Sequence, residues 1–325
     1  MKYSKIPGID KPVARLLQGA IMLGADNRDD NFRLLDACFE QGFTAFDNAH
    51  SYGHGATETE LGAWIAERGI RDQVVILTKC AHPENGIPDR VRPDFIRSDL
   101  EESLERLQTD YIELFLLHRD SREYPVGEIV DVLNEFKDAG KIGAFGGSNW
   151  LGDRVKAAND YAAANGKTPF TVSSPQFSVA EMIHPPWEGC TSVSGEQGEA
   201  DRAYYDANEM SLFTWSSLAG GFMTGKFTRD NLDSFDSYWD TNPIGAYAYE
   251  SNFKRLDRVR ELAADKGATP AQISVAYVLS NNPRYHAIVA AWQPEEAAIN
   301  AAAADIELSA AEIAWLEMKT EEKPA

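Results

Sequence analysis

The sequence predicts an α/β fold of the (β/α)8 TIM-barrel class, formed by the whole chain, residues 1–325, as one domain. Short apolar runs alternate with amphipathic segments along most of the chain. The apolar runs contain few polar residues, which is typical of parallel strands covered by helices. About eight such units can be counted, the number found in this barrel. The pattern also fits an open, doubly wound sheet, and we favour the closed barrel.

In the first half of the chain, each expected strand is followed by an expected helix. Apolar residues at helical spacing, among them Phe32, Leu35 and Phe39, predict the first helix. Pro93 is typical of a helix start. The expected strands are 16–20, 44–47, 74–77, 112–117 and 142–146, and the expected helices are 29–41, 58–66, 93–107, 126–137 and 155–165.

The second half continues the alternation less regularly. Ser309, with Glu312 three residues later, predicts a capping box at the start of the last helix. Two stretches, 180–198 and 226–250, break the alternation after expected strands, and long loops of this kind are usually functional or disordered. The expected strands are 170–173, 212–215 and 287–291, and the other expected helices are 200–208, 253–265, 270–279 and 294–303.

The composition indicates a soluble protein with a strongly acidic surface. The formal net charge of −20 disfavours nucleic acid and anionic membranes as partners. The chain has no basic start followed by an apolar stretch and no long apolar run, so we expect no signal peptide, no membrane span and a cytoplasmic location. Its three cysteines lack CxxC spacing, and no histidine cluster suggests a metal site.

Three short motifs resemble nucleotide-binding or kinase signatures without completing them. The Gly-His-Gly at 53–55 lacks the third glycine of a dinucleotide fingerprint and follows the second expected strand, not the first. The stretch 220–226 approaches a phosphate-binding P-loop, but Phe227 occupies the position of the magnesium-binding Ser or Thr. His118-Arg119-Asp120 lacks the asparagine of a kinase catalytic loop. We therefore expect these segments to serve another function.

Polar residues gather at the C-terminal ends of three successive expected strands. Asp47, Lys79 and His118 end the second, third and fourth strands, and Tyr52 follows the second. In a barrel these ends surround one mouth, where active sites form. A single Lys or His at a strand end is more often structural, but four such residues together predict a site.

These four residue types suit carbonyl reduction. Hydride addition leaves negative charge on the carbonyl oxygen, which then needs a proton donor such as Tyr52. A tyrosine hydroxyl has a pKa of about 10 and needs a stabilised anion to donate readily. A buried ammonium about 4 Å away, here Lys79 held charged by Asp47, contributes roughly 4 kcal/mol. His118 can orient the carbonyl and share the proton.

The segments that contain these four residues resemble the aldo-keto reductase family. The segment 42–53, GFTAFDNAHSYG, is similar to the family signature around its catalytic Asp and Tyr. The segments 77–79 (LTK) and 110–118 (DYIELFLLH) are similar to the strands that carry its Lys and His. The resemblance extends from about residue 16 to residue 316. It implies catalytic roles for Asp47, Tyr52, Lys79 and His118.

The resemblance also implies a nicotinamide cofactor. Ser148, Asn149 and Gln176 match the residues that hold the carboxamide, and Trp215 matches the ring that stacks on the nicotinamide. Residues 216–226 resemble the family's loop over the cofactor pyrophosphate, and the residues matched there are Ser216, Ser217, Leu218, Gly220, Gly225 and Lys226. The residues matched to the adenosine end of the cofactor are Ala291, Gln293, Glu296 and Asn300.

The adenosine end departs from the family pattern. Residues 289–296 contain no Lys or Arg, and Glu296 stands where the family often has Arg or Gln. A carboxylate is unfavourable beside a 2′-phosphate but can hydrogen-bond a ribose diol. We hypothesise that NAD(H) is accepted at least as well as NADP(H). The alternative is that Glu296 points into solvent while Lys226 or Arg229 reaches the phosphate, so NAD or NADP stays open.

The substrate is expected to be a small carbonyl compound or alcohol. Several Trp, amide and imidazole groups would suit a sugar or polyol, although packing explains each Trp equally well. Two alternative functions are a non-catalytic, nicotinamide-binding regulatory subunit and a lyase that forms a Schiff base through Lys79. The physiological reaction could also be the oxidation of a sugar or polyol. The sequence leaves open whether the protein is a monomer or a homo-oligomer. The substrate candidates are Asn48, His50, Trp150 and Trp187, with Tyr238 and Trp239 beside them.

Overall fold

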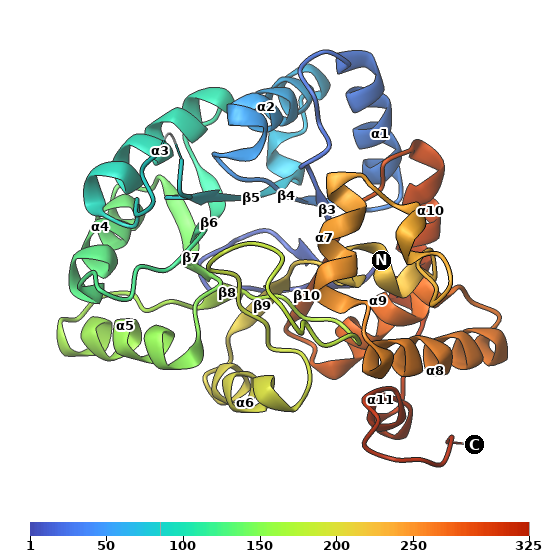
Figure 1. Cartoon of the computed structure of the whole chain (residues 1–325). Coiled ribbons are helices and arrows are strands. Elements are labelled where there is room, and N and C mark those ends of the chain that lie inside the picture. The colour runs from blue at the N-terminus through green and yellow to red at the C-terminus, as the bar shows by residue number, and fades with distance from the viewer. Residues whose placement is uncertain (85, 325) are drawn as a thin grey trace.

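The computed structural model describes residues 1–84 and 86–324 and contains a closed barrel of eight parallel strands (Figure 1). The barrel closes because β10 pairs with β9 on one side and with β3 on the other. The prediction of a barrel is thereby confirmed, and the open sheet is excluded. In barrel order the strands are β10 (Tyr285–Val289), β3 (Leu16–Gly19), β4 (Ala45–Asp47), β5 (Val75–Cys80), β6 (Ile112–Leu117), β7 (Ile142–Ser148), β8 (Val172–Ser174) and β9 (Ser211–Thr214).

Helices surround the barrel as an outer ring (Figure 1). Each expected helix is present with small shifts at its ends, and the capping box predicted at Ser309 and Glu312 is formed. The helices are α1 (Arg28–Glu40), α2 (Ala56–Arg68), α3 (Pro93–Arg106), α4 (Val126–Asp138), α5 (Gly152–Ala164), α6 (Glu199–Ala207), α7 (Tyr238–Tyr247), α8 (Glu250–Lys266), α9 (Pro270–Asn281), α10 (Pro294–Ala302) and α11 (Ala310–Leu316).

The apolar core has two parts because side chains alternate between the two faces of each strand. Outward-facing residues such as Phe46, Phe115 and Phe145 pack against the helices. Inward-facing residues such as Leu77 and Leu114 fill the barrel. The sequence analysis did not predict the antiparallel pair of β1 (Tyr3–Ser4) and β2 (Val13–Ala14). The N-terminal segment that contains this pair contributes to the inner core through Ile6, Ile9, Val13 and Ala14.

His286 links this N-terminal segment to the barrel. Its ring stacks on Phe213 with centroids 4.5 Å apart. Its Nδ1 lies 3.1 Å from the Leu212 carbonyl and so donates, which leaves Nε2 to accept from the Ser4 hydroxyl at 2.6 Å. Burial, assisted by the charge of Arg15, lowers the pKa of His286 to about 4. The imidazole is therefore neutral in the folded protein at neutral pH.

This pKa predicts a loss of stability in mild acid. Because the folded-state pKa lies below the unfolded value of about 6.5, the unfolded chain binds the extra proton more readily. Stability is unaffected above about pH 6.5, falls as the pH drops through 6.5 towards 4, and levels off below 4. His286 should contribute about 3 kcal/mol to this loss, at 1.36 kcal/mol per pKa unit. Urea unfolding at several pH values should show a shallower decline for His286→Gln, and an unchanged decline would refute the assignment.

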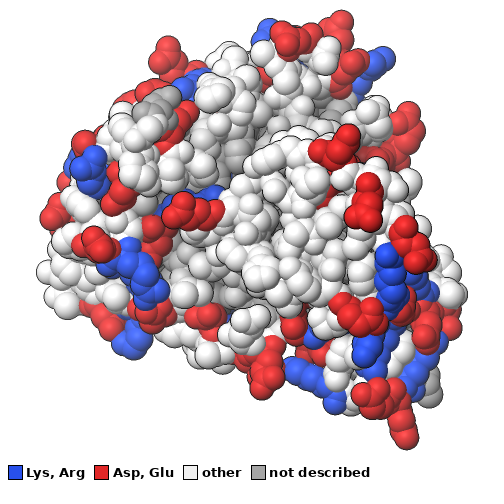
Figure 2. Space-filling view, viewed as in Figure 1, with Lys and Arg blue, Asp and Glu red and all other residues white. Residues whose placement is uncertain are grey.

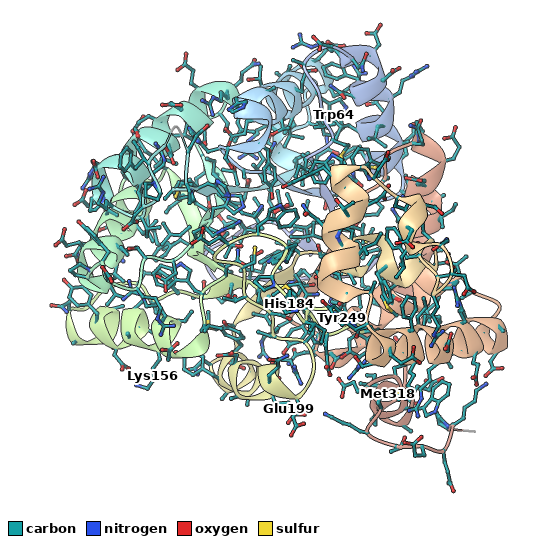
Figure 3. All side chains as sticks on the ribbon, in the orientation of Figure 1. Trp64, Lys156, His184, Glu199, Tyr249 and Met318 are labelled. Atoms are coloured by element: carbon teal, nitrogen blue, oxygen red, sulfur yellow. The ribbon has the colours of Figure 1, made fainter. Side chains whose placement is uncertain are left out.

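The expected loop 226–250 differs from the structure because it contains helix α7. Ser237 caps this helix by accepting a hydrogen bond from the Asp240 backbone N–H at 3.2 Å. The sequence does not predict α7 because it contains Pro243 and lacks an apolar stripe. The other long loop, 180–198, packs against this region: Ile183 N–H donates to the Ala246 carbonyl at 3.0 Å. Figure 3 shows His184 beside Tyr249 near the base of α7, with ring centroids 5.8 Å apart.

Within residues 1–84 and 86–324, none of the helices combines the length and apolar character that crossing a membrane requires.

Candidate active site

Strand alternation directs three of the predicted site residues into the barrel mouth. Ala45 and Leu77 belong to the inner core, so Asp47 and Lys79, two residues further along the same strands, face inwards as well. Leu116 is also an inner-core residue, and His118 follows it by two positions at the end of β6. All three side chains are buried. The strand ends therefore bring together residues that are up to 71 positions apart in the sequence.

Lys79 is the central group of this cluster. Its Nζ forms an ion pair with Asp47 Oδ1 at 2.6 Å, although the geometry of this contact is not that of a hydrogen bond. The same Nζ donates a hydrogen bond to the Asn48 backbone carbonyl at 2.8 Å. The Tyr52 hydroxyl lies 3.5 Å from the same Nζ. Burial by itself lowers the pKa of Lys79, but Asp47 and Tyr52 together raise it above its ordinary value. Lys79 is therefore charged and close to the Tyr52 oxygen.

Tyr52 is positioned by a tight turn between β4 and α2. Its backbone N–H donates to the Ala49 carbonyl at 3.0 Å, and its carbonyl accepts from the Thr57 hydroxyl at 3.2 Å. Burial raises the pKa of Tyr52, and the positive charge of Lys79 opposes that rise without cancelling it. The phenol is therefore protonated at neutral pH, as a proton donor must be.

His118 completes the cluster as a neutral imidazole. Its ring lies edge-on to Tyr52, with centroids 5.5 Å apart. Burial lowers the pKa of His118 well below its ordinary value, and the charges of Lys79 and Arg119 lower it further. Its Nδ1 is buried and has no hydrogen-bond partner among the described residues. An orphaned imidazole nitrogen of this kind is available to a bound substrate.

The three residues matched to carboxamide binding lie together beside this cluster. Ser148 Oγ donates to the Ser174 carbonyl at 2.9 Å, and Asn149 Nδ2 donates to the His118 carbonyl at 3.2 Å. Asn149 has a left-handed backbone with φ of 62°, which non-glycine residues adopt mainly at special sites. The side-chain oxygen Oε1 of Gln176 accepts from the hydroxyls of Ser192 and Ser194, so this side chain is fixed in place.

The loop after β9 contains several residues with a left-handed backbone conformation. Ser216, Ala219, Gly220, Gly221 and Gly225 all have positive φ values, between 48° and 94°. Alternation of left- and right-handed residues forms concave nests of N–H groups that bind anions. The region resembling a P-loop is therefore a candidate anion cradle.

The other predicted residues of this loop have different surroundings. The Ser217 hydroxyl donates to the Thr214 carbonyl at 3.0 Å, and Leu218 is partly buried. Trp215 Nε1 is buried without a hydrogen-bond partner among the described residues. Lys226 forms an ion pair with Asp240.

At the adenosine end, Glu296 lies at the start of α10. Its carboxylate accepts from the Trp292 backbone N–H at 2.7 Å, so it is fixed against the helix N-terminus. Ala291 is held by Gln18, whose amide makes two hydrogen bonds of 3.1 Å with its backbone. Gln293 is the exposed N-cap of α10, and Asn300 is partly buried on the same helix.

The four substrate candidates have different surroundings. Asn48 is buried next to Asp47, and its Nδ2 has no hydrogen-bond partner among the described residues. Trp187 lies beside Trp215, with ring centroids 6.2 Å apart, and its Nε1 donates to the Tyr238 hydroxyl at 2.6 Å. Both residues remain candidates, and so do the exposed Tyr238 and Trp239, whose ring centroids are 5.4 Å apart.

His50 and Trp150 do not join the cluster. The His50 ring is bonded to Glu102 at 2.9 Å, on the side of α3. Trp150 is fully buried in the outer core against Phe170, and its Nε1 donates to the Arg119 carbonyl at 3.1 Å. Both side chains pack or pair within the protein, and the expectation that they contact substrate stays a prediction.

Two residues of the site were missing from the sequence prediction. His82 follows β5 and places its ring 4.6 Å from that of His118. Its position just beyond a strand end was a signal that could have identified it. Thr191, in the long loop 180–198, donates its backbone N–H to Asn149 Oδ1 at 3.1 Å. No sequence signal could have identified that contact, because the loop folds back onto the barrel only in three dimensions.

Comparison with known proteins assigns this chain to a family. A sequence model described as "Aldo/keto reductase family" matches residues 15–321, which is nearly the whole chain and includes all the cluster residues. The chain belongs to the aldo/keto reductase family. Aldo/keto reductases are oxidoreductases that act on small carbonyl compounds or alcohols, and the sequence prediction of this family is confirmed.

Individual aldo/keto reductases agree with this assignment. The chain is 31% identical over 265 residues to aldo-keto reductase YhdN of Bacillus subtilis, covering 80% of this chain and 74% of YhdN. It is 27% identical over 267 residues to aldo-keto reductase yakc [NADP(+)] of Schizosaccharomyces pombe, covering 80% and 73%. The glycerol dehydrogenase AKR11B4 structure from Gluconobacter oxydans shares the fold, with a TM-score of 0.79, 22% identity and coverage of 99% and 97%.

Proposed function

We propose that this protein is an NAD(P)-dependent oxidoreductase that interconverts an aldehyde, ketone or sugar with its alcohol. The observation that carries the proposal is the position of the Lys79 ammonium, 2.6 Å from Asp47 and 3.5 Å from the Tyr52 hydroxyl. Tyr52 gives its proton to the carbonyl oxygen during reduction and takes it back during oxidation. Lys79 stabilises the tyrosinate that remains, and His118 directs the carbonyl oxygen towards Tyr52.

The cofactor proposal rests on the residues that surround the cluster. The backbone nest between Ser216 and Gly225 suits a pyrophosphate. Asn149 and Gln176, both fixed by hydrogen bonds, would hold the carboxamide, and Trp215 would support the nicotinamide ring. When bound, the nicotinamide supplies or accepts the hydride. The chain's own residues orient the substrate and move the proton.

We further propose that NAD(H) is accepted at least as well as NADP(H). Glu296 holds negative charge at the start of α10, where the family resemblance expects the adenosine 2′-position. The two basic residues suggested as alternatives are engaged elsewhere: Lys226 pairs with Asp240, and Arg229 pairs with Glu250 and Asp257. The relative yakc is labelled with NADP(+), so this chain would differ from it.

Steady-state kinetics with both cofactors tests this preference. We expect Glu296→Gln to raise kcat/KM for NADPH relative to NADH by about tenfold, which corresponds to about 1.4 kcal/mol of removed repulsion. Glu295→Gln, a change on the same helix turn, serves as the matched control. A hundredfold preference of the unmodified enzyme for NADPH would exclude the proposal.

The activity itself is tested with a panel of aldehydes, ketones and sugars. Oxidation of NADH or NADPH would be followed by its absorbance, and cofactor binding by fluorescence. Turnover of at least one carbonyl compound is the expected result. Tight cofactor binding without turnover of any substrate in either direction would instead identify a non-catalytic, nicotinamide-binding subunit.

A further inference from the structure

Arg119, directly after His118, is a cation at the barrel mouth that has no acidic partner in the part of the chain that the structure describes. Its Nη1 donates to the His118 carbonyl at 2.9 Å, and its Nε donates to the Glu188 carbonyl at 3.1 Å. Across residues 1–84 and 86–324, no carboxylate pairs with it, and Nη2 donates to no protein atom. The chain has 51 acidic residues against 31 basic ones, so an unpaired guanidinium at this position needs an explanation.

Other cations near the mouth are neutralised by carboxylates. Lys79 pairs with Asp47, and Lys226 pairs with Asp240. Most Lys, Arg, Asp and Glu side chains on this side of the molecule lie around its periphery, and the centre is largely uncharged (Figure 2). A guanidinium that no carboxylate of the protein neutralises attracts an anion. Few other charged side chains lie near the centre of this face, so the protein does little to weaken that attraction.

The guanidinium acts on the reacting groups. Burial is the main cause of the depressed pKa of His118 and of His82, and the charge of Arg119 lowers both further. The same charge opposes the burial-driven rise in the pKa of Tyr52. The hydrogen bond from Arg119 Nη1 to the His118 carbonyl, at 2.9 Å, places this charge beside the cluster.

The barrel order places Arg119 away from the expected cofactor phosphates. It follows β6, which is four strands from β10 in either direction around the barrel. The anion cradle follows β9, and Glu296 follows β10. A ligand held by Arg119 would therefore approach the cluster from the side opposite the adenosine end, which is the side left for a substrate.

We propose that Arg119 binds an anionic group on the substrate, so that the preferred substrates are aldehydes or ketones carrying a carboxylate or phosphate. This inference rests on the proposed reductase function and deepens it. The guanidinium is a permanent cation, and its N–H groups suit carboxylate and phosphate oxygens. Its backbone is fixed by the bond from Trp150 Nε1 to its carbonyl, and its side chain by the Glu188 carbonyl. Nη2 is left to donate to the substrate.

Two matched pairs of aldehydes test this assignment. The first pair is 4-formylbenzoate and the neutral 4-formylbenzamide, and the second is glyceraldehyde 3-phosphate and glyceraldehyde. We expect the unmodified enzyme to prefer the charged member of at least one pair in kcat/KM, and the preferred pair identifies carboxylate or phosphate. Arg119→Gln should lower kcat/KM for that charged member by about 10- to 100-fold and change its neutral partner less than about threefold. Arg119→Lys should retain part of the preference.

The controls separate a role in binding from a role in folding. Arg122→Gln, which removes an exposed surface pair with Asp153, should leave both pairs unchanged. Equal losses for charged and neutral aldehydes in Arg119→Gln would show that Arg119 only supports the loop at Glu188, and no preference in the unmodified enzyme would equally overturn the assignment. Calorimetric titration of the four aldehydes with the oxidised cofactor present measures the same discrimination as Kd. This measurement tests anion binding by Arg119 even if no aldehyde is turned over. A lack of turnover would refute the proposed reductase function and not the role of Arg119.

Discussion

Tyr52→Phe is expected to lower kcat by about 10²- to 10⁴-fold, the range that a positioned proton donor contributes. The substitution removes only the hydroxyl that lies 3.5 Å from Lys79 Nζ, so the ring stays against His118 and the turn after β4 keeps its hydrogen bonds. Steady-state reduction of the best carbonyl substrate, under saturating cofactor, measures the effect.

Cofactor binding is the control for this variant. Fluorescence titration with NADH and NADPH should give nearly the same Kd as the unmodified protein, because Tyr52 is not among the residues matched to the cofactor. Activity within a factor of three of the unmodified enzyme would contradict the role of Tyr52 as proton donor.

Lys79→Met should affect both stability and catalysis. The Lys79–Asp47 pair is buried, and removal of one partner leaves an uncompensated buried charge, which typically costs about 3–5 kcal/mol of unfolding free energy. Loss of the ammonium should also lower kcat by about 10³-fold, since a charge about 4 Å away is worth roughly 4 kcal/mol. Denaturant unfolding and steady-state kinetics measure the two effects.

A double variant separates the two effects. Asp47→Asn combined with Lys79→Met removes both charges, and should recover much of the lost stability without recovering activity. If the double variant is as unstable as Lys79→Met alone, the instability does not arise from the uncompensated Asp47 carboxylate. If it regains full activity, Lys79 has no catalytic role.

Much of the fold was predictable from the sequence because its signals are local. The composition and length of 112–117 are typical of a buried strand, and the apolar spacing of 93–107 is typical of a helix. Helix α7 was not predictable in this way, because Pro243 interrupts it and its surroundings stabilise it. The N-terminal pair β1 and β2 was also missed, because its two-residue strands are too short to show a period.

The candidate site also contains residues that the sequence could predict and residues that it could not. Asp47, Lys79 and His118 could be predicted because each ends an apolar strand, and parallel strand ends meet at one mouth. Trp150 could not be assigned, since a tryptophan after a strand packs outwards or inwards according to the surrounding helices. The same holds for His50, whose ring is bonded to Glu102 on α3.

The sequence alone determined the alternation of strands and helices, the family and the four residues of the cluster, because each depends on residue type and spacing along the chain. Only the tertiary structure decided that the barrel closes, that Lys79 contacts both Asp47 and Tyr52, and that Arg119 lacks a carboxylate partner among the described residues. Ion pairing and burial depend on groups distant in sequence, and the free energy of a charge depends on which of those groups the fold places beside it.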